Sequence, residues 1–188
     1  MLFQAARRLS NISNKIKLRP LVPSDAESVT KNANNINVWK NLTDLFPHPY
    51  TIKNANEFIN SQIGKEPPNT FAVILKNNAI GIIGLSVNLD IKDQCGDIGY
   101  WIGEKYWNKG IGTQIIKSIV KFGFETYKNI ECISASVFTD NPSSIRALEK
   151  SGFTNEKTIE KGLVKAGVKK DIHFFKITRK RANELRSI

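Results

Sequence analysis

A glycine turn between a predicted strand and a predicted helix constrains this chain more than any other feature. The strand is the run Asp97–Ile102, the turn is Trp107–Thr113, and the helix-like run that follows reaches Tyr127. Gly110 and Gly112 let the backbone approach a bulky anion closely. The unpaired N–H groups of a first helical turn would point at that anion, and the helix dipole favours its negative charge. This arrangement predicts a backbone site for a pyrophosphate.

Length and charge narrow the class of protein. The 188 residues suffice for one domain with a sizeable core, and no apolar run approaches the roughly 20 residues that span a bilayer. The net charge of +11 favours a phosphorylated cofactor, ribosomal RNA or an acidic protein as partner. The charge is scattered and no nucleic-acid module is recognisable, which argues against direct nucleic-acid binding. Cys95 and Cys132 fit neither a disulfide framework nor zinc spacing, so we expect free thiols.

The first residues differ in character from the rest of the chain. Residues 1–16 carry two arginines and no acidic residue, and their apolar residues recur at helical spacing. This pattern resembles a mitochondrial targeting segment, with an ordinary N-terminal helix or arm as the alternative. The expected location is therefore the cytoplasm, or the mitochondrial matrix if the segment is a targeting signal. We expect an N-terminal extension at 1–15, one domain at 16–180 and a tail at 181–188.

Periodicity and turn residues predict an α+β domain with a mixed, mostly antiparallel central sheet and flanking helices. Prolines and asparagines predict short or broken helices up to Trp39, with Ser24 as the first N-cap, and Thr51 as the N-cap of a further helix. A short helix should begin at Pro142 and end at Gly152. The predicted strands are Ile16–Val22, Phe71–Leu75, Ala79–Leu89, Asp97–Ile102, Ile133–Phe138 and Ile172–Ile177.

Three motifs occur in order at sensible spacing, and together they resemble a known family. They are Asp97-Ile98-Gly99-Tyr100-Trp101, Trp107-x-Lys109-Gly110-x-Gly112-Thr113, and Asn141-x-x-Ser144-x-x-Ala147-Leu148-x-Lys150-x-Gly152-Phe153. The set resembles the GNAT superfamily of acyl-CoA-dependent N-acyltransferases over Ile16–Ile177. Within it, the chain is most similar to the RimJ/RimL-like branch, which acetylates the N-termini of ribosomal proteins. Trp107 stands where the superfamily usually has glutamine or arginine, a departure that matches this branch.

The resemblance implies acetyl-CoA as the cofactor and a splayed pair of strands, 97–102 and 133–138, with a V-shaped slot between them. It assigns two groups of backbone contacts, one to the pantetheine arm and one to the pyrophosphate. The first group is Tyr100, Trp101 and Ile102, and the second is Lys109, Gly110, Ile111, Gly112 and Thr113. Asn141 would contact the cofactor or serve only as an N-cap. Ser144 would donate a proton to the leaving thiolate or be only an exposed first-turn serine.

Acyl transfer also needs a base for the attacking amine and a donor for the oxyanion. Asp97 is the best candidate base, because the family often carries an acid just before this Gly-Tyr pair. The alternative is a surface aspartate paired with a lysine. His173 and Tyr50 are candidates for the acceptor site, with ordinary packing as the alternative for both. Two histidines and scattered acids form no metal-ligand cluster, so we expect no metal.

The resemblance therefore predicts an acetyl-CoA-dependent N-acetyltransferase that acts on a primary amine, foremost a protein N-terminal α-amino group. Direct attack in a ternary complex is expected, because no cysteine is placed to carry an acyl-enzyme. One alternative is a small-amine acetyltransferase for a polyamine, amino acid or aminoglycoside, although a +11 protein attracts polyamines poorly. Another is a non-catalytic acyltransferase-like subunit of a larger assembly. A monomer and a homodimer are equally compatible with the sequence.

Overall fold

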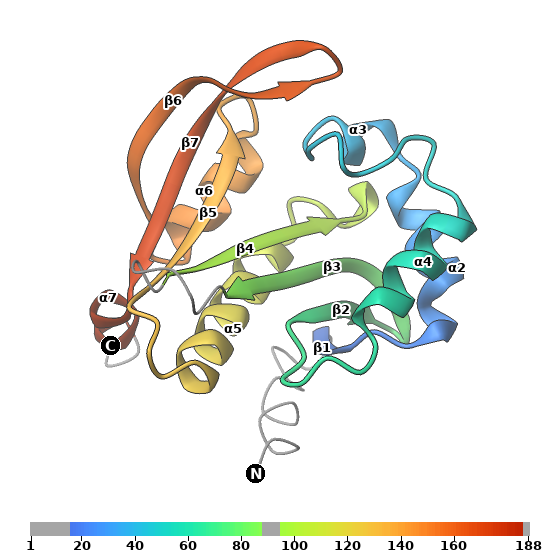
Figure 1. The fold of residues 1–188 in the computed structure, drawn as a ribbon, viewed down its shortest axis with the longest axis horizontal. Helices are drawn as coiled ribbons and strands as arrows, with labels where there is room; N and C mark the ends of the chain where they lie inside the picture. The colour runs from blue at the N-terminus through green and yellow to red at the C-terminus, as the bar shows by residue number, and fades with distance from the viewer. Residues whose placement is uncertain (1–15, 88–94, 186–188) are drawn as a thin grey trace. The chain divides into compact units, whose positions relative to one another are not determined.

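The computed structural model describes residues 16–87 and 95–185, and the predicted N-terminal extension lies outside them. Within these ranges the chain forms a seven-stranded sheet accompanied by helices, whose arrangement can be followed in Figure 1. The strands are β1 (Ile16–Pro20), β2 (Thr70–Leu75), β3 (Asn78–Val87), β4 (Cys95–Ile102), β5 (Cys132–Phe138), β6 (Thr154–Lys165) and β7 (Val168–Thr178). The helices are η1 (Pro23–Asp25), α2 (Ala26–Ala33), α3 (Ile36–Trp39), α4 (Ile52–Gln62), η2 (Glu104–Tyr106), α5 (Ile111–Thr126), α6 (Pro142–Lys150) and α7 (Arg179–Glu184).

The strands follow the order β1-β2-β3-β4-β5-β7-β6. The pairs β1–β2, β2–β3, β5–β7 and β6–β7 are antiparallel, whereas β4–β5 is parallel. The prediction of an α+β fold with a mixed, mostly antiparallel sheet is thereby confirmed. The chain divides into two compact units, Met1–Gly84 with Tyr100–Ile111 and Leu85–Gly99 with Gly112–Ile188. No helix in the described ranges is both long and apolar enough to cross a bilayer.

The first unit contains the antiparallel strands β1, β2 and the beginning of β3, with α2 and α4 side by side (Figure 1). A tight turn joins β2 to β3, where Lys76 and Asn77 both have positive φ, as the predicted hairpin requires. Thr51 caps α4 as predicted, accepting a hydrogen bond from the Asn54 N–H. One hydrophobic core cluster of this unit contains Leu21, Ala26, Val29, Ala33, Tyr50, Ala55, Ile59, Ala72, Ile74, Ala79 and Ile82.

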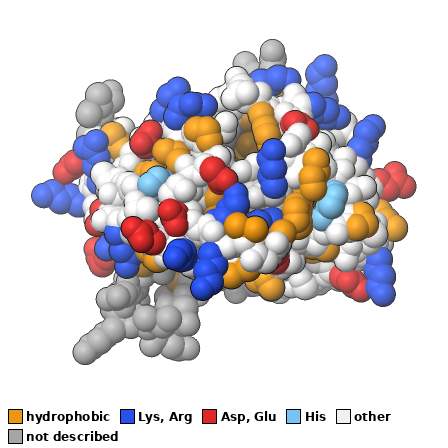
Figure 2. Space-filling view, turned by 90° about the horizontal axis from the view of Figure 1, so that it is seen from above, with side chains coloured by type: hydrophobic (Ala, Val, Ile, Leu, Met, Phe, Trp, Pro, Cys, Tyr) orange, Lys and Arg blue, Asp and Glu red, His pale blue; other side chains and the backbone are white. Residues whose placement is uncertain are grey.

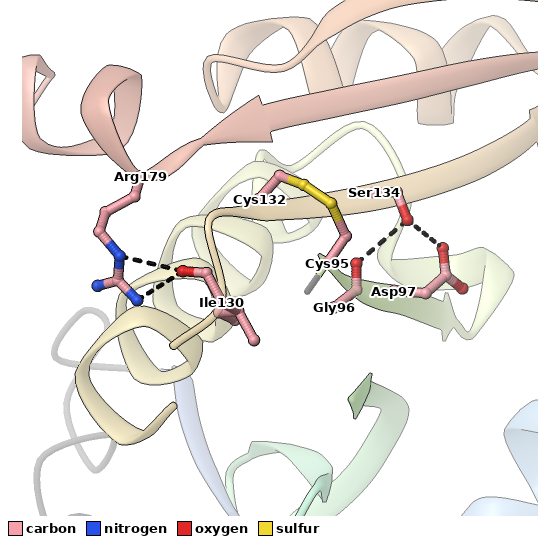
Figure 3. The surroundings of a disulfide bond; sticks show 7 residues. All are labelled: Cys95, Gly96, Asp97, Ile130, Cys132, Ser134 and Arg179. Carbon is pink, nitrogen blue, oxygen red and sulfur yellow. Dashed lines mark hydrogen bonds between the residues drawn. A yellow bond between two sulfur atoms is a disulfide. The ribbon is translucent and has the colours of Figure 1, made fainter. Parts of the chain in front are cut away.

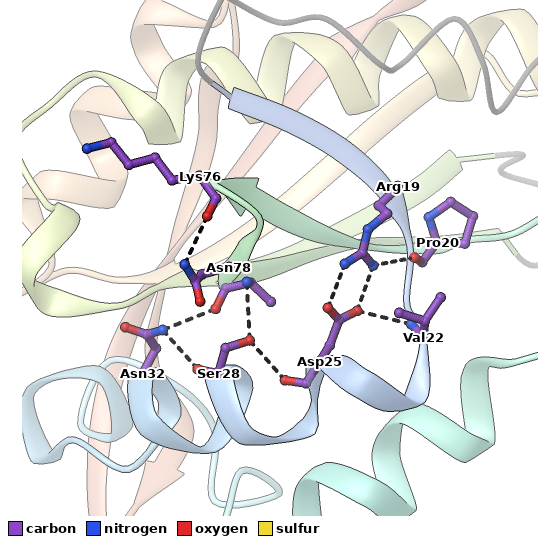
Figure 4. A network of polar contacts seen from close by, with 9 residues as sticks. Arg19, Pro20, Val22, Asp25, Ser28, Asn32, Lys76 and Asn78 are labelled. Atoms are coloured by element: carbon purple, nitrogen blue, oxygen red, sulfur yellow. Dashed lines mark hydrogen bonds and ion pairs between the residues drawn. The ribbon is translucent and has the colours of Figure 1, made fainter.

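A buried carboxylate organises the connection from β1 to α2 (Figure 4). Asp25 is 3% exposed, and its two oxygens accept hydrogen bonds from both terminal nitrogens of Arg19 at 2.7 Å. The same carboxylate accepts the Val22 N–H at 3.0 Å. Ser24, the predicted N-cap, instead lies inside the 3-10 turn η1, and the residue at the N-cap position is Val22. The prediction was wrong because the side chain of Asp25, one residue later, satisfies the free N–H at this end.

The second unit is built around β5, which pairs in parallel with β4 on one side and antiparallel with β7 on the other. Helix α5 begins at Ile111, and its apolar residues at helical spacing are buried: Ile111, Ile115, Ile116, Ile119, Val120 and Phe124. Helix α6 begins with Asn141 as N-cap and Pro142 at its first position, as predicted. Gly152, with φ +93°, follows its end in the left-handed conformation that glycine tolerates best.

The sequence interpretation gave no residue range for strand β6 and predicted no helix at α7. Strand β6 is exposed along most of its length and lies at the edge of the sheet, so its residues carry no buried face to mark a strand. Helix α7 occupies residues that were expected to have no regular structure, and the Thr178 side chain caps it. Both elements therefore form without the apolar periodicity on which sequence interpretation depends.

The Arg179 side chain caps the C-terminal end of α5. Its guanidinium donates to the carbonyl oxygens of Phe124, Tyr127, Lys128 and Ile130 at 2.7–3.0 Å. It also lies over the Phe124 ring, 4.8 Å from the centroid. The last carbonyls of a helix have no partners within the helix, and a cation at that end also complements the helix dipole. Figure 3 shows the contact with Ile130.

Replacing Arg179 with alanine is expected to lower the free energy of unfolding by about 2–3 kcal/mol, because several carbonyls lose a charged donor at once. Thermal or urea unfolding measures the change. Arg181→Ala on the same helix is the matched control, since Arg181 forms only an exposed ion pair with Glu184 at 3.5 Å. Its expected effect is below about 0.5 kcal/mol. Equal losses in the two variants would contradict a specific role for Arg179.

The two cysteines form a disulfide bond, contrary to the prediction of free thiols (Figure 3). Cys95 and Cys132 are directly opposite each other in the parallel β4–β5 pair, with their Cα atoms 4.6 Å apart. The prediction was wrong because a separation of 37 residues reveals nothing about the register of two strands. Cys132 is buried, as its place in a strand predicted.

Candidate active site

Hydrogen bonds to β3 and to the end of β4 fix the segment that leads into the turn before α5. The backbone N–H of Gly103 donates to the Ile80 carbonyl at 2.8 Å, just after β4 ends. Helix η2 follows, and the indole Nε1 of Trp107 donates back to the Ile102 carbonyl at 2.6 Å. Trp107 therefore ties the end of β4 to the beginning of the glycine turn. This local contact gives a structural reason for tryptophan at the position where the superfamily usually has glutamine or arginine.

The turn itself uses the left-handed conformation twice. Asn108 has φ +58° and Gly110 has φ +72°. A Cβ atom added at Gly110 would meet no protein atom within 4 Å, so the backbone is open on that side. The next residue, Ile111, begins α5, whose first N–H groups have no partner within the helix. A helix N-terminus beside an open backbone is suited to bind an anion such as a pyrophosphate.

Asn141 and Ser144 lie at the beginning of α6. The Asn141 side-chain Oδ1 accepts the backbone N–H of Ser144 at 3.1 Å, so Asn141 is an N-cap. This is the structural role that was weighed against a cofactor contact, and the two roles do not exclude each other. Ser144 is half-buried in the first turn of the helix. Its role as a proton donor stays a prediction.

Asp97 lies at the last pair of the parallel register between β4 and β5. The register runs over Cys95↔Cys132, Gly96↔Ile133 and Asp97↔Ser134, whereas β4 continues to Ile102 and β5 to Phe138. Ser134 Oγ lies 2.8 Å from Asp97 Oδ1 and 3.1 Å from the Gly96 carbonyl oxygen (Figure 3). Ser134 was not predicted as a site residue, because only the register of two strands places it beside Asp97.

Two opposing influences act on the carboxyl group of Asp97. The residue is exposed, but surrounding protein atoms displace part of its hydration, and this desolvation raises the pKa of Asp97 above its ordinary value. The hydrogen bond from Ser134 favours the charged form and acts in the opposite direction. An accessible carboxyl group with a raised pKa has the properties that a general base needs.

His173 lies in β7, opposite Val137 of β5 and Thr158 of β6. Its ring Nδ1 is 2.8 Å from Thr158 Oγ1 and 3.1 Å from Asn155 Nδ2. An amide nitrogen can only donate, so in this arrangement Nδ1 is the acceptor and the neutral ring carries its proton on Nε2. In that tautomer Nε2 is a hydrogen-bond donor.

Tyr50 and Trp101 belong to one aromatic cluster in the first unit. Phe46 stacks on Tyr50 with centroids 4.8 Å apart and meets Trp101 edge-on at 5.9 Å. Tyr50 is only 4% exposed, and burial raises its pKa to about 12, so its hydroxyl stays protonated at neutral pH. Tyr50 is thus a core residue of the aromatic cluster. Its direct contact with an acceptor stays a prediction, and Phe46 and Trp101 are the more accessible rings.

The predicted site residues are distributed over both units. Tyr50, Trp101 and the turn up to Ile111 belong to the first, and Asp97, Ser144 and His173 belong to the second. Among these residues, the Asn141 side chain contacts the Ser144 backbone. The rings of Tyr50 and Trp101 both contact the Phe46 ring. In the described ranges, no three His, Cys, Asp or Glu side chains are grouped so that they could hold a metal ion. Lys and Arg side chains on the face in Figure 2 alternate with acids.

Comparison with known proteins identifies the class to which this fold and turn belong. Residues 15–154 match the model of the acetyltransferase (GNAT) domain. The chain therefore belongs to the GNAT acetyltransferase family, and it is an acetyl-CoA-dependent N-acetyltransferase. This finding confirms the predicted family and the class of enzyme, and it agrees with the predicted cofactor because this family uses acetyl-CoA. The RimJ/RimL-like branch stays a prediction.

Three particular proteins illustrate the similarity. The uncharacterized N-acetyltransferase YoaA of Bacillus subtilis (strain 168) is 33% identical over 102 residues, which are 54% of this chain and 56% of that protein. The ribosomal-protein-S5-alanine acetyltransferase from Vibrio fischeri superposes with a TM-score of 0.77 at 21% identity, covering 88% of this chain and 94% of that one. Spermidine N-acetyltransferase from Vibrio cholerae, solved with CoA and spermine, has a TM-score of 0.74 at 21% identity, with 91% and 99% covered.

Proposed function

We propose that this enzyme acetylates the N-terminal α-amino group of a protein. The observation that carries the proposal is the net charge of +11, which favours an acceptor presented on an acidic or RNA-containing surface over a small polycation. The structural similarity to an acetyltransferase of ribosomal protein S5 supports the same choice. Acetyl-CoA would be held through the backbone of Lys109–Thr113, with Asn141 as a further contact.

Each candidate residue has a defined part in the proposed reaction. The acceptor reacts as its neutral amine, whose nitrogen forms a bond with the thioester carbon. Asp97 takes the one proton that this nitrogen loses on becoming an amide, directly or through a water molecule, and the C–S bond breaks. A backbone N–H within Tyr100–Ile102 stabilises the negative charge on the carbonyl oxygen during this step. Ser144 gives its hydroxyl proton to the departing thiolate and recovers one from solvent. The products are an amide and free CoA.

An acetylation assay with a panel of acceptors tests the proposal. Peptides with a free α-amino group and matched peptides with a blocked one are compared with spermidine, free amino acids and an aminoglycoside. A kcat/KM at least about 100-fold higher for free N-termini is the expected result. Preference for spermidine would instead favour the small-amine function, which the similarity to spermidine N-acetyltransferase supports. Binding of acetyl-CoA with no turnover of any acceptor would favour a non-catalytic role.

Replacing Ser134 with alanine should shift the pH dependence of the reaction. The hydrogen bond from Ser134 lowers the pKa of Asp97, so its loss raises that pKa further. A base must be deprotonated, and the acid limb of the kcat/KM profile should therefore move to higher pH, with the plateau at high pH less affected. A profile identical to that of the parent enzyme would show that Asp97 is not the group that titrates.

A further inference from the structure

Two lysines share one tyrosine ring beside the glycine turn. Lys105 Nζ lies 5.0 Å from the centroid of the Tyr106 ring, and Lys109 Nζ lies 5.7 Å from the same centroid. Lys109 Nζ also donates to the Lys105 carbonyl at 2.7 Å, which fixes one ammonium group against the segment that carries the other. Both lysines are exposed and Tyr106 is half-buried. We call these three residues the Lys105–Tyr106–Lys109 cluster.

The acid next to this cluster does not neutralise it. Glu104 accepts hydrogen bonds from Asn35 Nδ2 at 2.8 Å and Asn37 Nδ2 at 2.7 Å, one on each carboxylate oxygen. Within residues 16–87 and 95–185, neither Lys105 nor Lys109 forms an ion pair. Two like charges are therefore held beside one ring, where the ring face stabilises them only in part. Such an arrangement favours an anion with more than one negative charge.

We propose that the cluster recognises the 3′-phosphate of coenzyme A and so distinguishes the cofactor from its dephosphorylated form. The inference rests on the proposed cofactor site, because the cluster immediately precedes Gly110. A phosphate monoester carries close to two negative charges at neutral pH, which two ammonium groups match. The diphosphate is the less suitable partner for the two lysines, since the backbone N–H groups at the beginning of α5 would already bind it in the proposed site. The two lysine side chains would thus distinguish acetyl-CoA from its dephosphorylated form, at a turn whose backbone binds the diphosphate in the proposed site.

Binding of two cofactors to variant proteins tests the inference. Isothermal titration gives Kd for acetyl-CoA and for acetyl-3′-dephospho-CoA with the parent chain, Lys105→Met, Lys109→Met and the double variant. The parent should bind acetyl-CoA at least about tenfold more tightly than the dephosphorylated form. The double variant should lose most of that preference, with Kd for the dephosphorylated form unchanged. Methionine keeps the length of the side chain, so a loss of preference reports the charge.

Lys157→Met is the matched control, because Lys157 Nζ lies 5.5 Å from the Phe174 ring in an equivalent contact elsewhere. It should leave both dissociation constants unchanged. An unaltered preference in the double variant would overturn the inference, as would equal weakening of both cofactors, which would assign the lysines to the diphosphate. If the parent chain bound neither cofactor, the proposed cofactor site itself would fail. These results are distinguishable from one another.

Discussion

Replacing Asp97 with asparagine is expected to lower kcat/KM for acetyl transfer by roughly 10²- to 10⁴-fold, the usual contribution of a positioned general base. Asparagine has nearly the same shape, and its side-chain oxygen can still accept the Ser134 hydrogen bond. It cannot take a proton from the amine. The loss should therefore appear in turnover, while Kd for acetyl-CoA stays close to that of the parent enzyme.

The same substitution should leave the fold intact. Desolvation raises the pKa of Asp97 in the folded protein, so ionising this carboxyl group costs folding free energy. The stability contributed by its protonated form is present below the unfolded pKa and is lost as the pH rises through the folded pKa. Asparagine is never ionised, and the variant should be at least as stable as the parent at neutral pH. Thermal unfolding checks this expectation.

Asp140→Asn provides the matched control for Asp97. Asp140 pairs with Lys170 in the second unit, and it has no part in the proposed reaction. Its replacement should change neither kcat/KM nor Kd appreciably. If Asp97→Asn retained full activity at all pH values, another group or a water molecule would have to be the base, and the proposed role of Asp97 would be wrong.

Replacing Gly110 with alanine is expected to weaken acetyl-CoA binding by roughly 5- to 150-fold. A side chain at φ +72° introduces strain of about 1–3 kcal/mol. The free turn can relieve that strain by changing conformation, which moves the N–H groups at the beginning of α5. Binding of acetyl-CoA would then have to restore the original turn at the same free-energy cost. Isothermal titration would measure this cost as a higher Kd.

The variant Gly64→Ala distinguishes the effect of backbone strain on stability from an effect on cofactor binding. Gly64 has φ +83°, and a Cβ atom there also meets nothing within 4 Å, so the substitution repeats the backbone conflict outside the proposed site. Both variants should lose a similar amount of stability, but only Gly110→Ala should lose affinity. Unchanged affinity in Gly110→Ala would contradict the proposal that this turn holds the pyrophosphate.

Local patterns made α5, α6 and the glycine turn predictable. The isoleucines of α5 recur at three- and four-residue intervals, and the glycines and Pro142 mark the ends of α5 and α6 directly in the sequence. Strand β6 could not be located in this way, because a strand exposed along most of its length has no face that needs apolar residues. Sequence therefore predicts best where burial selects the residues.

Contacts between distant segments explain what the sequence could not predict. Ser134 lies 37 residues from Asp97, and Arg179 lies more than 50 residues from the carbonyl of Phe124. The Ser134–Asp97 contact and the Cys95–Cys132 bond depend on the register between β4 and β5, whereas Arg179 follows β7 and depends on its pairing with β5. The family's motifs identified Asp97 as a candidate, but only the strand register shows which neighbour adjusts its pKa.

The indole of Trp107 has a practical consequence. Its hydrogen bond to the Ile102 carbonyl places a fluorophore beside the turn that is proposed to bind the cofactor. The emission of an indole depends on its hydrogen bonding and on the polarity around it. Replacing Trp39 and Trp101 with phenylalanine would leave Trp107 as the sole tryptophan, since the chain contains three. Occupancy of the turn could then be followed optically, in real time and without an attached dye.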